Sequence, residues 1–162
     1  MRILVLTDRY PPHYTGAYEL NCHQVTEALR KRGHEAIVLT TRYGIGKPLV
    51  EGHVYRTMHT LNTAYRNNLH RRLRQPVELY QVLHNYIIAR RRAEAFQPDI
   101  VFVWHMWNAS ILPILAVQDV GFHTLYRIGS HWPLFLKQAY VDEPSRLRRC
   151  FRSALIGFRR FD

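Results

Sequence analysis

The sequence predicts an α/β fold built on a doubly wound parallel sheet, Rossmann-like in its strand–helix alternation. Short apolar runs recur at residues 3–6, 36–40, 100–103 and 124–128. Each run is too short for a helix and too continuously apolar for a half-exposed strand, so each is typical of a strand buried on both faces. Helical patterns separate the runs, and this alternation indicates parallel strands.

The first forty residues predict a strand–helix–strand unit. Residues 17–32 place four side chains on one face of a helix, namely Tyr18, Cys22, Val25 and Leu29. Gly33 follows the basic end of this helix and suits the position after its C-cap. With the usual right-handed crossover, residues 3–6 and 36–40 become parallel strands of one sheet.

The remaining elements follow from weaker patterns. A loose alternation predicts a short third strand at residues 54–58, near a sheet edge. Helices are expected at 76–96, with Pro76 in its first turn, and at 108–120, capped by Asn108. The apolar stripe of the first of these helices predicts its packed face: Val77, Tyr80, Leu83, His84, Ile87 and Ile88. Counted along the chain, the usual strand order is three-two-one-four-five. Further helices are expected at 133–140 and at 144–160.

Length and composition favour one folded domain, residues 1–162, because 47% of the residues are hydrophobic. No segment approaches the roughly 20 apolar residues of a membrane span, and the chain begins with a strand, so a cytoplasmic location is expected. Cys22 and Cys150 have no metal or redox spacing. The histidines form no recognised metal motif, so no metal is expected.

The net charge of +11 has three interpretations: nucleic acid, an anionic membrane surface, or small anionic substrates. No nucleic-acid-binding motif accompanies the charge, so nucleic acid is not expected as a partner. Arginines gather at residues 66–74 and 146–160. These segments can face an anionic membrane, solvent, or a further domain, and the sequence leaves the three alternatives open.

The loop at residues 8–16 is a candidate ligand-binding segment. It is longer than the 2–6 residues usual for such connections. It leaves the carboxyl end of the first strand and opens onto a helix N-terminus, where α/β sheets bind ligands and anions. Gly16 allows the backbone to approach a ligand. A rigid surface loop stiffened by Pro11 and Pro12 is the alternative interpretation.

Aromatic and histidine side chains recur in the loops that follow the predicted strands. A parallel sheet brings these loops to one edge, with Tyr10, Tyr14, Trp104, Trp107 and Trp132, and with His13, His105 and His131. Aromatic rings beside polar groups suit sugars, although each ring alone is equally typical of core packing. His105 is the candidate catalytic residue, as a partner that holds a substrate hydroxyl; a structural role is the alternative.

Several of these motifs together resemble the N-terminal half of family-4 glycosyltransferases, which have the GT-B fold. The matching segments are Tyr10-Pro11-Pro12, Thr15-Gly16-Ala17, Arg32-Gly33-His34-Glu35 and the strand after Gln97-Pro98-Asp99. Ala17 replaces the second glycine of the family's Gly-Gly pair. The family's histidine after the strand aligns with Trp104, so His105 lies one residue later.

The resemblance implies transfer of a sugar from a nucleoside-diphosphate sugar to a free or lipid-linked acceptor, with retention of configuration and without metal or cofactor. It places the donor phosphates at Gly16 and Ala17. It assigns acceptor binding to Tyr10, Tyr14, Glu19, Trp104, Trp107, His131 and Trp132. The family's C-terminal nucleotide-sugar-binding domain has no counterpart in this chain, so the chain alone is expected to be inactive. A basic, non-enzymatic domain that binds nucleic acid or anions and a small self-sufficient α/β enzyme are the alternatives.

Overall fold

The computed structural model describes residues 1–61, 68–129 and 131–133, with the backbone alone for 68–75. The chain divides into two units, Met1–Gly129 and Ser130–Asp162. All the strands and helices considered below belong to the first unit. Of the second unit, the structure describes His131, which is exposed, Trp132, which is buried, and Pro133.

A six-stranded sheet with the order β3-β4-β2-β1-β5-β6 forms the centre of the first unit. Its strands are β1 (Arg2–Thr7), β2 (Glu35–Thr41), β3 (Leu49–Glu51), β4 (Val54–Met58), β5 (Ile100–His105) and β6 (Thr124–Tyr126). All neighbouring pairs are parallel except β3 with β4. Without β3, the order is the expected three-two-one-four-five. The fold is therefore α/β with a mostly parallel sheet, an arrangement compatible with a Rossmann-like fold.

The parallel strands confirm the predicted apolar runs, with two differences at the edges. The last strand, β6, ends at Tyr126 rather than at residue 128. The three-residue edge strand β3, whose residues are all exposed, was not predicted from the sequence. An exposed strand lacks the buried apolar pattern that reveals the others. Because β3 pairs with β4, the predicted third strand lies one position inside the edge.

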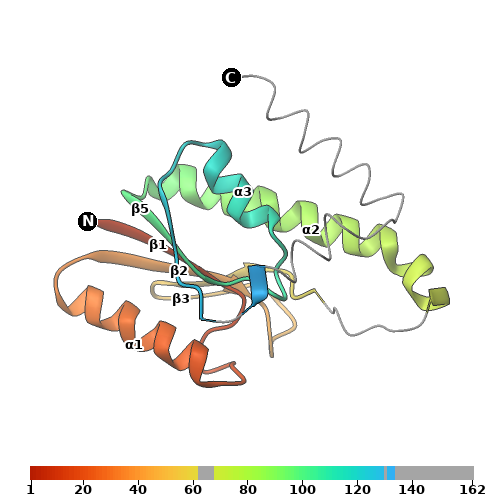
Figure 1. Cartoon of the computed structure of the whole chain (residues 1–162), viewed down its shortest axis with the longest axis horizontal. Helices are drawn as coiled ribbons and strands as arrows, with labels where there is room; N and C mark the ends of the chain where they lie inside the picture. Colours follow the sequence, from red (N-terminus) through yellow and green to blue (C-terminus); the bar gives the residue numbers. More distant parts are fainter. Residues whose placement is uncertain (62–67, 130, 134–162) are drawn as a thin grey trace. The chain divides into compact units, whose positions relative to one another are not determined.

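In the described part of the first unit, three helices accompany the sheet: α1 (Ala17–Lys31), α2 (Asn68–Phe96) and α3 (Leu112–Asp119). Figure 1 shows α1 on one side of the sheet and α2 with α3 on the other. Helix α1 confirms its predicted range and face, because Cys22 is buried and Tyr18, Val25 and Leu29 pack against the same core cluster. Among the described residues, no helix is long and apolar enough to cross a membrane.

Helix α2 corrects two predictions. It begins at Asn68, so that Pro76 lies inside the helix rather than in its first turn. The predicted packed face is also wrong, because Val77, Tyr80, Leu83 and Ile87 are exposed. The buried face consists of Val82, Asn85, Ala89, Ala93 and Phe96. Small alanines let a helix approach its neighbours closely, and hydrophobic periodicity gives such residues little weight.

Helix α3 is shorter than predicted. It begins at Leu112, with Ile111 at the N-cap position, instead of at residue 108. Asn108 does not cap the helix, since its side chain and backbone N–H both bond to Asp8. Gly121 follows the helix with a φ of +92°, as its predicted role at the helix end requires.

A buried amide on α2 fastens the loops that follow β4 and β5. The Asn85 side chain is fully buried. Its Oδ1 accepts a 2.6 Å hydrogen bond from the His59 N–H. Its Nδ2 donates to the carbonyl oxygens of His59, at 2.9 Å, and Ala109, at 3.3 Å. Asn85 therefore fixes both loops relative to the helix.

A buried arginine on β4 holds the loop that follows β1. Arg56 Nη1 donates to the Tyr10 carbonyl oxygen at 3.0 Å, and Nη2 donates to that of Pro11. Its Nε lies 3.2 Å from Oε2 of Glu51 on β3. The long loop at residues 8–16 is therefore anchored on the sheet itself, and the Pro11–Pro12 peptide bond within it is cis.

We expect Asn85→Ala to lower the free energy of unfolding by about 1–3 kcal/mol, because it leaves the buried N–H and C=O of His59 without their partner. Urea denaturation followed by circular dichroism measures the change. Gln118→Ala removes an exposed amide and is the matched control. Equal denaturation midpoints for the two variants would contradict the role of Asn85.

Candidate functional site

The ends of β1 and β5 mark the point where the strand order reverses. From β1 the chain proceeds through β2 to β4 on one side, and it resumes at β5 on the other side of β1. Open α/β sheets bind ligands at such a switch point, outside the carboxyl ends of the strands. Asp8 directly follows β1, and His105 is the last residue of β5.

A buried carboxylate and a histidine pair at this switch point. Asp8 is fully buried, and its Oδ1 lies 3.0 Å from Nδ1 of His105. Its Oδ2 accepts hydrogen bonds from Asn108, from the backbone N–H at 3.1 Å and from Nδ2 at 2.8 Å. The Thr41 hydroxyl donates to the Asp8 carbonyl oxygen. Both carboxylate oxygens thus have partners, as burial of a charge demands.

The pairing determines how His105 presents its ring. An ionised carboxylate can only accept hydrogen bonds, so Nδ1 of His105 carries the hydrogen that faces Asp8. In the neutral ring, Nε2 then holds the lone pair. The His105 side chain is 20% exposed, whereas that of Asp8 is completely buried. A ring held by a buried carboxylate at an accessible edge is suited to accept a hydrogen bond or a proton from a substrate hydroxyl.

Two aromatic rings lie beside His105. The Tyr18 ring centroid is 5.4 Å from that of His105. The Trp107 ring is stacked on it at 6.5 Å, with 23° between the planes. The Tyr18 hydroxyl lies 3.0 Å from the carbonyl oxygen of Trp104 and 2.6 Å from that of Arg127. Tyr18 therefore connects α1 to the ends of β5 and β6.

Of the other aromatic residues predicted to bind an acceptor, Tyr14 is exposed, whereas Tyr10 and Trp104 are buried. Trp104 packs against Tyr18 and Phe102. Tyr10 packs edge-on against His23, and its hydroxyl lies 3.1 Å from Nδ1 of that histidine. Burial raises the pKa of the Tyr10 phenol. The structure thus places these two rings in the core.

The predicted donor-phosphate loop ends in a helix cap. Gly16 is the N-cap residue of α1, with an extended φ of −157° that any residue adopts. The buried Glu19 carboxylate accepts a 3.1 Å hydrogen bond from the Gly16 N–H. A Cβ at Gly16 would lie 3.5 Å from that carboxylate oxygen, an ordinary contact. Glu19 therefore already supplies a negative charge to this helix end, and Ala17 beside it is exposed.

The predicted site residues do not all belong to one unit of the structure. His131 and Trp132 belong to the second unit. Within the described part of the chain, no group of three or more His, Cys, Asp and Glu side chains could hold a metal ion. Among the predicted site residues of the first unit, His105 and Trp107 are the two in direct ring contact at the switch point.

Asp8 and Asn108 were not predicted as site residues. From the sequence, Asp8 was expected only to begin a loop and Asn108 to cap a helix. One signal was available, because an aspartate directly after a central buried strand stands at the ligand-binding edge of the sheet. Nothing in the sequence indicates that this aspartate pairs with a histidine 97 positions away.

A second group of titratable side chains lies at the neighbouring strand ends. Arg42 directly follows β2, and His59 directly follows β4. Arg42 Nη2 is 2.6 Å from Nδ1 and 2.7 Å from Nε2 of His59. The rings of His59 and His84 are 4.6 Å apart. Burial, then Arg42, then His84 lower the pKa of His59 to about 4.

Comparison with known protein families and with curated proteins finds no match to this chain. The fold and the site define an α/β domain whose buried aspartate holds a histidine at the switch point of a mostly parallel sheet. The geometry of that pair is the main structural guide to function.

We expect Asp8→Asn to destabilise the fold and release His105. The amide replaces one acceptor oxygen by a donor, so either His105 or Asn108 then faces a donor. The loss should be about 1–3 kcal/mol, and ¹⁵N NMR should show that His105 loses its preference for hydrogen on Nδ1. Asp119→Asn, which changes an exposed carboxylate, is the control. An unchanged His105 tautomer would contradict the pairing.

We expect stability to fall as the pH is lowered from about 6.5 toward 4. The folded His59 has a lower pKa than the unfolded residue, so below about 6.5 the unfolded chain binds more protons than the folded one. Thermal melts across this range measure the loss, and His59→Gln should make the profile flatter. His123→Gln, at an exposed histidine, should keep the slope of the native protein. Parallel profiles for all three proteins would contradict the assignment.

Proposed function

We propose that this chain is the acceptor-side, N-terminal half of a GT-B glycosyltransferase, with a doubly wound, Rossmann-like sheet. Its reaction is transfer of a sugar from a nucleoside-diphosphate sugar to an acceptor hydroxyl, with retention and without metal. The observation that carries the proposal is His105, held by buried Asp8 at the switch point. The resemblance of residues 10–18 and 32–40 to family-4 glycosyltransferases supports the same conclusion.

In this proposal, His105 holds the acceptor. Its Nε2 accepts a hydrogen bond from the hydroxyl that attacks the anomeric carbon. Asp8 keeps the ring in the required tautomer and stabilises any positive charge that forms on it. Trp107 and the exposed Tyr14 offer ring faces to the C–H groups of a sugar. The bond from the anomeric carbon to the diphosphate breaks as the new glycosidic bond forms.

The donor diphosphate then lies near the N-terminus of α1, across the cleft from a second, nucleotide-binding domain. The Gly16 N–H already donates a hydrogen bond to the Glu19 carboxylate. The donor diphosphate therefore either displaces this carboxylate or binds the remaining free N–H groups of the first helical turn. A lipid-linked acceptor at the inner face of an anionic membrane fits the basic composition. The arginine-rich segments that motivate this partner, 66–74 and 146–160, lie outside the residues whose side chains are described.

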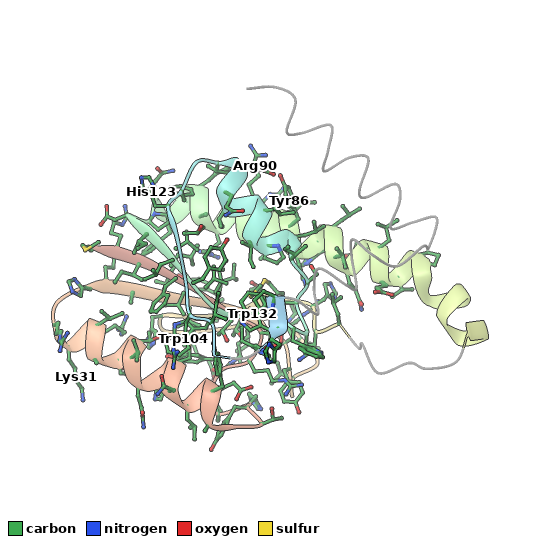
Figure 2. The ribbon with its side chains drawn as sticks, in the orientation of Figure 1. Lys31, Tyr86, Arg90, Trp104, His123 and Trp132 are labelled. Atoms are coloured by element: carbon green, nitrogen blue, oxygen red, sulfur yellow. The ribbon has the colours of Figure 1, made fainter. Side chains whose placement is uncertain are left out.

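We expect His105→Ala to reduce sugar transfer by about 10²-fold or more, the usual contribution of a positioned proton acceptor. The assay follows nucleoside diphosphate release by the full-length enzyme over a panel of nucleotide sugars. His123→Ala is the control. His123, labelled in Figure 2, precedes β6 and so lies at the amino ends of the strands, whereas His105 lies at the carboxyl ends. Gly16→Ala should retain the melting temperature of the native protein, because its Cβ meets only an ordinary contact.

Two outcomes would contradict the proposal. One is turnover by His105→Ala equal to that of His123→Ala, which would remove His105 from the site. The other is a low-micromolar dissociation constant for a nucleotide sugar, measured by calorimetry on this chain alone. Such affinity would show that the donor site does not need a second domain.

A further inference from the structure

The group formed by Arg42, His59 and His84 has no function in the proposed transfer. It lies at the carboxyl ends of β2 and β4, on the ligand-binding edge but outside the Asp8–His105 pair. The ring of Tyr80 borders it, 5.7 Å from His59 and 5.9 Å from His84. All three basic side chains are partly accessible to solvent.

Among the residues that the structure describes, these three side chains have no negatively charged partner. None of the ion pairs formed by described carboxylates involves Arg42, His59 or His84. Residues 52–77, which include His59, contain five arginines and no aspartate or glutamate. The buried Nδ1 of His84 has no hydrogen-bond partner in the described part of the chain.

Arg42 and His59 do not satisfy each other's hydrogen-bonding groups well. The two nitrogens of one imidazole point in different directions, so a single Nη2 group cannot bond well to both. Burial, and then proximity to Arg42, also lower the pKa of His84. Without an anion, the site is therefore a guanidinium facing two neutral rings that resist protonation.

We propose that Arg42, His59 and His84 form a phosphate-binding subsite. A phosphate dianion accepts hydrogen bonds from several directions, so it can take donors from the guanidinium and from both imidazoles at once. Its charge favours the protonated rings and reverses the electrostatic cost of their proximity to Arg42. A planar carboxylate, with two oxygens, matches three separate donors less well.

The subsite is held in place before any ligand arrives. Asn85, which follows His84 on α2, bonds to both the N–H and the carbonyl oxygen of His59. The Thr60 hydroxyl donates to Thr41 Oγ1 at 2.9 Å, and Thr41 in turn donates to the Asp8 carbonyl oxygen. The phosphate subsite and the Asp8–His105 pair are therefore joined through one set of hydrogen bonds.

The two sites share one edge of the sheet. The strand ends run in the order β4, β2, β1, β5, so His59 and His105 are separated by three strand spacings. At roughly 4.8 Å per spacing, this is on the order of 14 Å. A single extended acceptor that carries a phosphate can span both sites. This last step rests on the proposed function, whereas the phosphate subsite itself does not.

Titration of the chain with inorganic phosphate at pH 7 and constant ionic strength tests the subsite. Histidine ring NMR should show that the resonances of His59 and His84 shift and that their pKa values rise. Arg42→Gln and His59→Gln should each weaken phosphate binding at least tenfold, with melting curves to confirm folding. Arg90→Gln removes the same charge from an arginine already paired with Glu94, and it should change binding less than twofold.

A second experiment identifies the source of the phosphate. It compares binding of the chain to phosphatidylcholine vesicles that contain or lack phosphatidic acid. If Arg42→Gln weakens binding of both phosphate and anionic vesicles, the subsite takes a lipid headgroup. If it weakens phosphate binding alone, the subsite takes a soluble phosphate ester. Equal losses for Arg42→Gln and Arg90→Gln, or no shift at His59 and His84, would overturn the proposal. Neither outcome depends on glycosyl transfer.

Discussion

The burial of one carboxylate organises the ligand-binding edge of this protein. Asp8 is completely removed from water, and an ionised carboxylate tolerates this only where hydrogen bonds replace its hydration. Those bonds come from His105 at the end of β5 and from Asn108 in the loop beyond it. Thr41 at the end of β2 bonds to the backbone of the same residue. The ends of three adjacent strands must therefore keep fixed positions for the carboxylate to remain satisfied.

The same edge holds histidines in two opposite electrostatic settings. His105 faces a carboxylate, which orients its ring. His59 faces a guanidinium, which opposes positive charge on its ring. One setting suits a group that receives a proton or hydrogen bond from a neutral hydroxyl, and the other suits a group that waits for an anion. Under the two proposals made above, the ligand of this edge is neutral at one end and negatively charged at the other.

Two buried polar side chains, one on β4 and one on α2, hold the loops at this edge of the sheet in place. Arg56 projects inward from β4 and holds the carbonyl groups of the loop after β1. Asn85 projects inward from α2 and holds the loops after β4 and β5. Each polar group is buried where hydrophobic residues are the rule, and each has its hydrogen bonds satisfied within the fold. A site whose loops are fastened in this way needs little reorganisation to bind.

The sequence alone was sufficient for the five parallel strands of the sheet and for α1. A continuous apolar run such as residues 3–6 reveals a strand buried on both faces, because no other short element needs every side chain to be apolar. The period of Tyr18, Cys22, Val25 and Leu29 identified the packed face of α1, and the usual strand order proved correct. These features depend on local pattern and on the general rules of chain connection.

Other features depend on which surfaces of the helices and the sheet pack together, and the local sequence pattern does not predict them. On α2, the alanines at 89 and 93 and the amide of Asn85 face inward, while Val77, Tyr80 and Ile87 stay exposed. Trp104, predicted at the ligand-binding edge, packs in the core against Tyr18. The sequence indicated His105 but not Asp8, because the two are 97 positions apart and only the parallel pairing of β1 with β5 brings them into contact. The composition of a chain and the spacing of its residues indicate which side chains are buried and which element they form. Two distant side chains form a hydrogen bond only when the strands that carry them lie side by side.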